Sequence, residues 1–217
     1  MRPKTVGVIF SRADFRRALR MRKPPDLFEL RLDRLIASID EVSAASLGLP
    51  APFIATARAP REGGANDLST SRRRALLLAF LPRAAWVDIE FRSARSLAAV
   101  SKSAAAHHAG TIISFHDFKT TPPAAQLEDI VSGAVSLGAD LIKVATRTDT
   151  PAQLETLLDF FERKRRTANV VAMGIGKLGR ISRVELARRG CLLNYGHLGS
   201  PAAAGQLAIA DLRRILA

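Results

Sequence analysis

The sequence has few of the features that mark secreted or membrane proteins. Its only cysteine, Cys191, cannot form an internal disulfide, which suits a reducing compartment. The longest uninterrupted apolar run, Ala75–Leu81, is far too short to cross a bilayer. Arg2 and Lys4 are not followed by a long apolar stretch, so no targeting segment is predicted. We expect a cytoplasmic protein without membrane association.

Aromatic residues are also scarce, with a single tyrosine and a single tryptophan among 217 residues. The formal net charge is +13, from 33 basic and 20 acidic residues. Nucleic-acid grooves usually combine basic and aromatic side chains, and the basic clusters at 16–17, 72–74 and 164–166 lack interleaved aromatics. No nucleic-acid partner is therefore predicted, and the positive field favours a small anionic ligand. A homodimer stays open.

Strand-like and helix-like segments alternate along the whole chain. Eight short runs read as strands: Val6–Phe10, Leu27–Asp33, Phe53–Arg58, Trp86–Phe91, Thr111–Asp117, Leu141–Thr146, Asn169–Ile175 and Leu192–Leu198. Helical patterns lie between them, among them Ser71–Leu81, Ala124–Leu137, Pro151–Lys164 and Gly205–Leu216. This alternation predicts an α/β fold, a (β/α)8 TIM barrel that forms one domain over residues 1–217.

In such a barrel the chemistry takes place at the C-terminal ends of the strands, so charged residues there are candidates for a site. In the second predicted strand, Glu29, Arg31 and Asp33 alternate with apolar residues and share one face. The apolar face packs on the helices, which directs the three charges into the barrel. There they either form a structural ion network or serve a polar ligand.

Lys143 lies in the middle of the apolar run Leu141–Ala145. Burial disfavours a charged ammonium, and a neutral amine can attack a ketone to form a Schiff base. The alternative is a lysine whose stem is buried while its charge stays in water.

Other polar residues fall near the ends of the remaining strands. Arg58 ends the third strand and leads into Glu62-Gly63-Gly64, while Asp88 and Glu90 alternate along the fourth. His116, near the end of the fifth strand, suits acid and base catalysis at neutral pH. His197, near the end of the eighth strand, is ambiguous between a structural and a functional residue.

A glycine-rich segment, 174–179, matches the dinucleotide pattern G-x-G-x-x-G. It occurs late in the chain, and no acidic residue closes a following strand to bind a ribose. We interpret it instead as a loop that brings Arg183 to the mouth of the barrel, where a guanidinium can bind a carboxylate at two points.

Taken together, these residues resemble type I 3-dehydroquinate dehydratase, the Schiff-base family of the shikimate pathway to aromatic amino acids. The resemblance rests on six short motifs in the right order: Glu29-Leu30-Arg31-Leu32-Asp33, Arg58 with Glu62-Gly63-Gly64, Ser114-Phe115-His116-Asp117-Phe118, Lys143-Val144-Ala145, Gly179-Arg180-Ile181-Ser182-Arg183, and Gly205-Gln206. It covers nearly the whole chain and implies a lyase that converts 3-dehydroquinate to 3-dehydroshikimate and water.

The resemblance also implies roles for particular residues. Lys143 forms the Schiff base, His116 is the general acid and base, and Glu62 orients it. Substrate-binding roles fall to the polar residues around them: Glu29, Arg31, Arg58, Arg183 and Gln206. Neither a metal nor an organic cofactor is needed.

The loop before the last helix departs from the family pattern. The family typically reads Ser/Thr-Ala-Pro-Gly-Gln where this chain has 202–206 as Ala-Ala-Ala-Gly-Gln, so a hydroxyl and a proline are missing. Ser200 can replace the hydroxyl only if the loop shifts. Two other functions stay open: another Schiff-base barrel such as a class I aldolase, and a catalytically silent barrel that binds anions or RNA.

Overall fold

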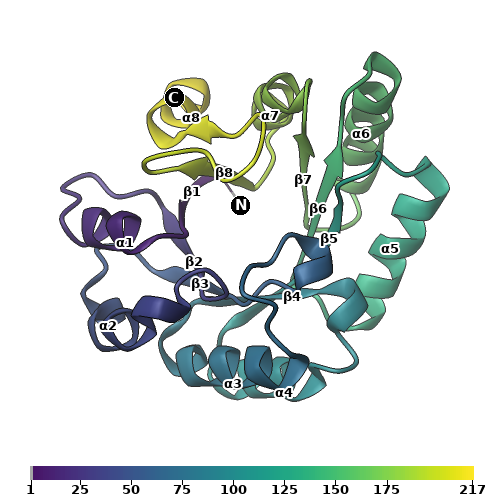
Figure 1. Cartoon of the computed structure of the whole chain (residues 1–217). Helices are drawn as coiled ribbons and strands as arrows, with labels where there is room; N and C mark the ends of the chain where they lie inside the picture. Colours follow the sequence, from purple (N-terminus) through teal and green to yellow (C-terminus); the bar gives the residue numbers. More distant parts are fainter. Residues whose placement is uncertain (1) are drawn as a thin grey trace.

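The computed structural model of the protein describes residues 2–217, and its strands form one parallel sheet. The nine strands are β1 (Lys4–Ile9), β2 (Leu27–Arg31), β3 (Phe53–Thr56), β4 (Trp86–Glu90), β5 (Gly110–Asp117), β6 (Leu141–Arg147), β7 (Val170–Ile175), β8 (Leu193–His197) and β9 (Leu207–Ala208). The first eight correspond to the eight predicted strands. Figure 1 shows them as a ring with the helices around its outside, and the predicted barrel is confirmed.

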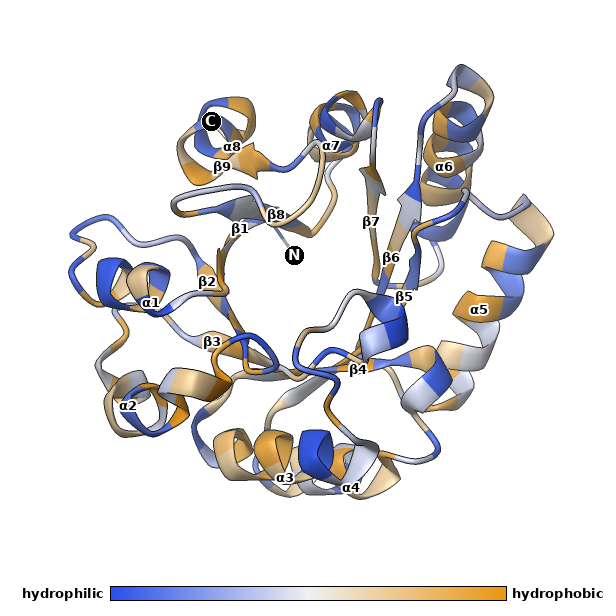
Figure 2. Ribbon diagram, in the orientation of Figure 1, coloured by the Kyte–Doolittle hydropathy of each residue, from blue (hydrophilic) through white to orange (hydrophobic). Residues whose placement is uncertain are grey.

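The α-helices follow the strands in alternation. They are α1 (Arg12–Leu19), α2 (Ile39–Ala45), α3 (Thr70–Phe80), α4 (Ala98–Ala106), α5 (Ala124–Ser136), α6 (Pro151–Lys164), α7 (Gly179–Arg188) and α8 (Ile209–Leu216). None of these helices, within residues 2–217, combines the length and apolar character needed to cross a membrane. Hydrophobic and hydrophilic residues alternate along their ribbons in Figure 2, as expected of helices with one face on a core.

Most predicted boundaries differ from those of the structure by one or two residues, and two of the differences matter for the site. The last helix begins at Ile209 rather than Gly205, because Gly205 has a positive φ of 83° and Leu207–Ala208 pair with β8 as β9. The second strand ends at Arg31 rather than Asp33. The chain turns there, so Asp33 does not point into the barrel with Glu29 and Arg31.

The ring of backbone pairing has one open seam. The strand order is β7-β6-β5-β4-β3-β2-β1-β8-β9, so within residues 2–217 no ladder joins β7 to β8. The short β9 pairs with the C-terminal end of β8 at Gly196 and His197 and covers part of that edge. One side chain also links the two edges of the seam. The Cys191 thiol, just before β8, donates to the carbonyl of Ala172 on β7 at 3.7 Å. Cys191 is buried, as expected.

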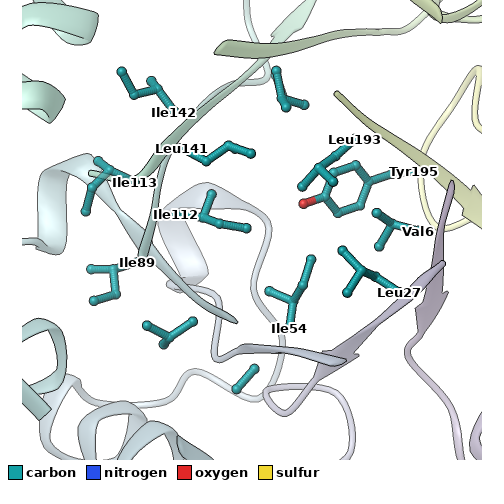
Figure 3. Packing of buried hydrophobic residues seen from close by; sticks show 14 of the residues in the cluster. Val6, Leu27, Ile54, Ile89, Ile112, Ile113, Leu141, Ile142, Leu193 and Tyr195 are labelled. Carbon is teal, nitrogen blue, oxygen red and sulfur yellow. The ribbon is translucent and has the colours of Figure 1, made fainter. Parts of the chain in front are cut away.

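The interior of the barrel is apolar at the N-terminal ends of the strands. Figure 3 shows the inward side chains of this apolar floor, which we define as Val6, Leu27, Ile54, Ile112, Leu141 and Leu193. Their neighbours Ile113 and Ile142 point outward to the helices. Because side chains alternate along a strand, the residues two positions further on face inward again, one layer higher. That layer holds Glu29, Asp88 and Lys143.

Gly110 opens β5 where the ring of Trp86 lies against the backbone. A Cβ added at this glycine would meet Cε3 of Trp86 at 2.4 Å. We expect Gly110→Ala to lower the free energy of unfolding by about 1–3 kcal/mol, as overpacking does, measured by urea unfolding. The matched control is Gly48→Ala, whose added Cβ would meet Leu19 at an ordinary 3.6 Å. An equal effect of both substitutions would contradict the packing argument.

Candidate active site

A pocket of about 220 Å³ opens at the C-terminal ends of the strands. It brings together every predicted site residue, from four strands or strand ends, the 3-10 turn after β3, α7 and the loop before β9: Glu29, Arg31, Arg58, Glu62, His116, Lys143, Arg183 and Gln206. Ser200 and His197 are not among its lining residues. The placement of these side chains therefore follows the prediction, and their roles are argued below.

The amine of Lys143 is buried rather than extended into water. The residue is 3% exposed, and Nζ lies 2.7 Å from Oδ2 of Asp88 and 3.3 Å from Oε1 of Glu29. β6 positions it, since Lys143 pairs with Ser114 of β5 and Val171 of β7. The structure thus excludes the alternative in which the charge reaches solvent. Two carboxylates from β2 and β4 thus lie directly against the amine.

Arg58 completes the charged layer around these carboxylates. Its Nη1 lies 2.9 Å from Oδ1 of Asp88 and 3.6 Å from Oε1 of Glu90, and Ser114 bonds both Arg58 and Asp88 at 2.6 Å. Burial disfavours the ionised form of Asp88, but the positive charges of Arg58 and Lys143 outweigh it and lower the pKa of Asp88. The carboxylate therefore stays ionised beside the amine.

His116 and Glu62 form a hydrogen-bonded pair on the pocket wall. Nδ1 of His116 lies 3.0 Å from Oε2 of Glu62, and the backbone N–H of His116 donates to the same oxygen at 3.1 Å. The acceptor fixes the proton on Nδ1 and leaves the lone pair of Nε2 free. Burial, followed by the positive charges of Arg58 and Lys143, lowers the pKa of His116 well below its usual value. The ring is thus a neutral base at pH 7.

Glu62 is held in place from the other side by a cation. Its Oε1 lies 3.2 Å from Nη1 of Arg92, and the carboxylate is fully buried. Burial raises the pKa of Glu62, and Arg58 and Arg92 counter only part of that effect. Phe118 lies beside the pair formed by His116 and Glu62. Its ring is nearly parallel to that of His116, with the ring centroids 6.3 Å apart.

Among residues 2–217, Arg183 is the buried cationic side chain that forms no ion pair with a carboxylate. It lies on α7, 7% exposed, and its Nη1 donates to the carbonyl of Tyr195 at 3.3 Å while Nε has no partner. Burial lowers the pKa of Arg183 to about 10, so the guanidinium stays charged at neutral pH. A buried, charged donor with free N–H groups facing a pocket calls for an anionic ligand.

The glycine-rich segment supports the loop that covers Arg183. Gly179 and Gly205 pack backbone to backbone, since a Cβ at Gly205 would meet the nitrogen of Arg180 at 2.7 Å. The N–H of Gly176 donates to the carbonyl of Ala204 at 3.3 Å. Oε1 of Gln206 accepts from the N–H of Ala202 at 2.6 Å, which folds the loop 202–206 over the pocket.

Asp33 has a different role from the one its alternation with Glu29 and Arg31 suggests. Its carboxylate forms two bonds with Arg31, of 3.0 and 2.8 Å, and accepts from the N–H groups of Arg58 and Ala65. Burial opposes its ionisation, but Arg31 and these N–H groups lower the pKa of Asp33. Asp33 thereby ties the loop after β3, which carries Glu62, to the end of β2.

The geometry can be compared with known proteins at this point. A family model described as type I 3-dehydroquinase matches residues 6–217. The chain belongs to the type I 3-dehydroquinase family. A 3-dehydroquinate dehydratase from Pyrococcus abyssi is 33% identical over 196 residues, which cover 88% of this chain and 86% of that protein. One from Methanothermobacter thermautotrophicus is 34% identical over 194 residues, 88% of this chain and 84% of its own.

Solved structures of type I 3-dehydroquinases have the same fold. The 3-dehydroquinate dehydratase from Geobacillus kaustophilus aligns with a TM-score of 0.86 at 30% identity, over 99% of this chain and 90% of that one. A structure from another family, an HMG-CoA lyase from Bacillus subtilis, is 12% identical with a TM-score of 0.66 and shares only the fold. Family membership makes this chain a hydro-lyase.

The sequence alone did not single out every residue at the centre of the site. Asp88 was noted only for its alternation with Glu90, yet it contacts Lys143 more closely than Glu29 does. Tyr195 lines the pocket beside the same amine. Alternation along β4 and β8 gives the inward direction of both residues. Their height in the barrel depends on the strand register, which sequence periodicity does not give.

The ties made by Asp33 lead to a stability prediction. We expect Asp33→Asn to lower the free energy of unfolding by about 2 kcal/mol at pH 7, because two buried charge-assisted bonds are lost. The depressed pKa means that ionised Asp33 stabilises the fold above its unfolded-state pKa of about 4, and that this is lost as the pH falls further. The difference between variant and parent should therefore shrink toward pH 3 in urea titrations. Asp159→Asn, at an exposed position of α6, is the control and should change little at either pH.

Proposed function

We propose that this enzyme converts 3-dehydroquinate to 3-dehydroshikimate and water through a Schiff base on Lys143, with His116 as general acid and base. The relatives named as 3-dehydroquinate dehydratases support the substrate. The observation that carries the mechanism is the buried amine of Lys143 in the same pocket as the neutral imidazole of His116. A nucleophilic amine and a base on one cavity wall suit elimination next to a ketone.

The first step joins the substrate to the enzyme. Lys143 loses a proton, and its Nζ attacks the carbon of the C3 ketone. The ketone oxygen takes up protons and leaves as water when the iminium forms. Glu29 and Asp88, 3.3 and 2.7 Å from Nζ, stabilise the positive charge that the iminium restores to this position. The same two carboxylates therefore suit both the resting ammonium and the covalent intermediate.

The elimination follows from the iminium. Nε2 of His116 takes the proton from C2, and the electron pair moves to nitrogen and gives a neutral enamine. The pair then returns and expels the C1 hydroxyl, which leaves as water with the proton from His116. Glu62 holds the imidazole in the tautomer that leaves Nε2 free for both transfers. Hydrolysis of the imine releases 3-dehydroshikimate and regenerates Lys143.

Binding of the substrate carboxylate is assigned to Arg183, with Gln206 beside it. Arg183 has free N–H groups in the pocket and no carboxylate of its own among the described residues. Glu29, Arg31 and Arg58 lie near the ring hydroxyls in this arrangement. Their carboxylate and guanidinium partners hold these three side chains in fixed positions. All proton and electron movements use protein groups, so the mechanism needs no metal or organic cofactor.

We also propose that the enzyme acts in the cytoplasm, since its one cysteine is a buried free thiol that suits a reducing compartment. Burial raises the pKa of Cys191 to about 11, which keeps the thiol protonated and unreactive. Assembly as a homodimer and the lack of a nucleic-acid partner stay predictions.

The covalent step has a direct test. Borohydride added with 3-dehydroshikimate should fix a ligand-sized mass on Lys143, because it reduces an imine and leaves a non-covalent complex unchanged. Lys143→Met should lose both the labelling and the turnover, read by peptide mass spectrometry and by the ultraviolet absorbance of the conjugated enone. Lys102→Met, on the exposed side of α4, should retain both. Normal dehydration by Lys143→Met would exclude the Schiff base.

His116→Ala should separate proton transfer from capture. We expect turnover to fall by roughly 10²–10⁴-fold, the usual cost of a lost acid–base group, while trapping on Lys143 survives. His107→Ala, at an exposed position after α4, serves as the control. A rate close to that of the parent enzyme would move the base to another residue. Loss of trapping together with turnover would show that His116 is needed for imine formation.

A further inference from the structure

Tyr195 is the only tyrosine of the chain, and the mechanism above gives it no role. It lies on β8 and points into the barrel, where its ring reaches toward the central axis (Figure 3). The centroid of the ring is 4.5 Å from Nζ of Lys143. The residue is 5% exposed and lines the same pocket as the amine.

The ring lies at the boundary between two layers of the interior. On one side is the apolar floor, because Tyr195 pairs with Val6 in the β1–β8 ladder and Leu193 lies two residues before it on β8. On the other side is the charged layer with Lys143. The amine thus has carboxylates on one side and an aromatic face on another, and its side chain is almost fully buried. A cation within about 6 Å of an aromatic centroid is attracted by the ring quadrupole, and more strongly when it is desolvated.

We propose that the aromatic face of Tyr195 is a further catalytic group, one that stabilises the positive charge on Nζ of Lys143 in the resting ammonium and in the iminium. The role in the iminium rests on the function proposed above; the role in the ammonium does not. No additional covalent step is involved. The ring favours each cationic stage over the neutral amine and the neutral enamine.

The hydroxyl of Tyr195 is separate from this role. Its oxygen is buried and has no hydrogen-bond partner among residues 2–217. Burial raises the pKa of Tyr195 well above its usual value, and the negative charges of Glu29 and Asp88 raise it further. The side chain therefore stays neutral and cannot act as a counter-ion. What reaches Lys143 is the ring, and phenylalanine would supply the same face.

Other charged groups around the amine stay in place when the ring is removed. They are Glu29 from β2, Asp88 from β4, His116 from β5 and, through its contacts with both carboxylates, Arg58 from β3. Tyr195→Phe, Tyr195→Leu and Tyr195→Met leave all four unchanged. A difference between the aromatic and aliphatic variants then reports the ring itself.

The first test needs no substrate. Reductive methylation of the free enzyme with formaldehyde and cyanoborohydride consumes only the neutral amine, and peptide mass spectrometry follows Lys143 across a pH series. We expect the half-maximal labelling rate to move about one pH unit toward acid in Tyr195→Leu and Tyr195→Met, because the ammonium loses its aromatic face. Tyr195→Phe should stay within about 0.3 of a pH unit, roughly a twofold change in the amine equilibrium.

Leu193→Val is the control for loosened packing, since it alters the apolar floor on the same strand and does not line the pocket. It should leave the labelling profile unchanged. If Tyr195→Leu does not fold, as judged by circular dichroism, Tyr195→Met carries the test with a longer side chain. An unchanged profile in the folded aliphatic variant, or an equal shift in Tyr195→Phe, would overturn the proposal.

The second test concerns the iminium. Borohydride trapping of product on the parent enzyme should fade at alkaline pH as the imine loses its proton, and in the aliphatic variants it should fade about one pH unit earlier. No trapping on the parent enzyme would refute the proposed function while the first test stands by itself. Trapping with the same pH profile in all variants would refute the role of Tyr195 and leave the Schiff base intact.

Discussion

Charges inside this barrel must be balanced there, because the side chains that carry them are almost fully buried. Lys143 and Arg58 face Glu29 and Asp88, and Glu90 is shared between Arg58 and Arg73. Each of these guanidinium or amine groups lies against a carboxylate from another element of the barrel. An unpaired charge in such a layer would cost several kcal/mol. Pairing therefore holds the Nζ atom of Lys143 at one position along the barrel axis, in the wall of the pocket.

Arg183 breaks this balance. Its guanidinium is buried like the others, yet among residues 2–217 its one hydrogen bond goes to the carbonyl of Tyr195, and it forms no ion pair with a carboxylate. The charges around the amine of Lys143 are thus balanced within the protein, whereas the charge of Arg183 is not. In the proposed function, a ligand with one carboxylate and one ketone reaches Arg183 and Lys143 at once. The difference between the two positions then orients the substrate.

Much of the fold and of the site followed from the sequence, because period-two alternation and the order of elements are local signals. They indicated the eight strands, the inward direction of Glu29 and Arg31, and the position of His116 near the C-terminal end of its strand. They did not give the turn after Arg31, which depends on Asp33 binding N–H groups from the loop after β3. Nor did they show that Tyr195 lies against Lys143. In the sheet order five strands lie between β6 and β8, and the shorter way round crosses the open seam beside β7. Such contacts depend on shear and tilt across the whole barrel.

The seam between β7 and β8 links ligand binding to the strength of the barrel. Elsewhere a continuous ladder of backbone bonds resists separation of neighbouring strands, but here Arg183, carried by the helix that follows β7, reaches across to the carbonyl of Tyr195 on β8. An anion bound to this guanidinium restricts its motion and so strengthens the contact between α7 and β8. By mass action, a ligand that binds only when this contact is formed raises the free energy needed to break it. In the proposed binding mode, the substrate carboxylate therefore also strengthens the contact between β7 and β8.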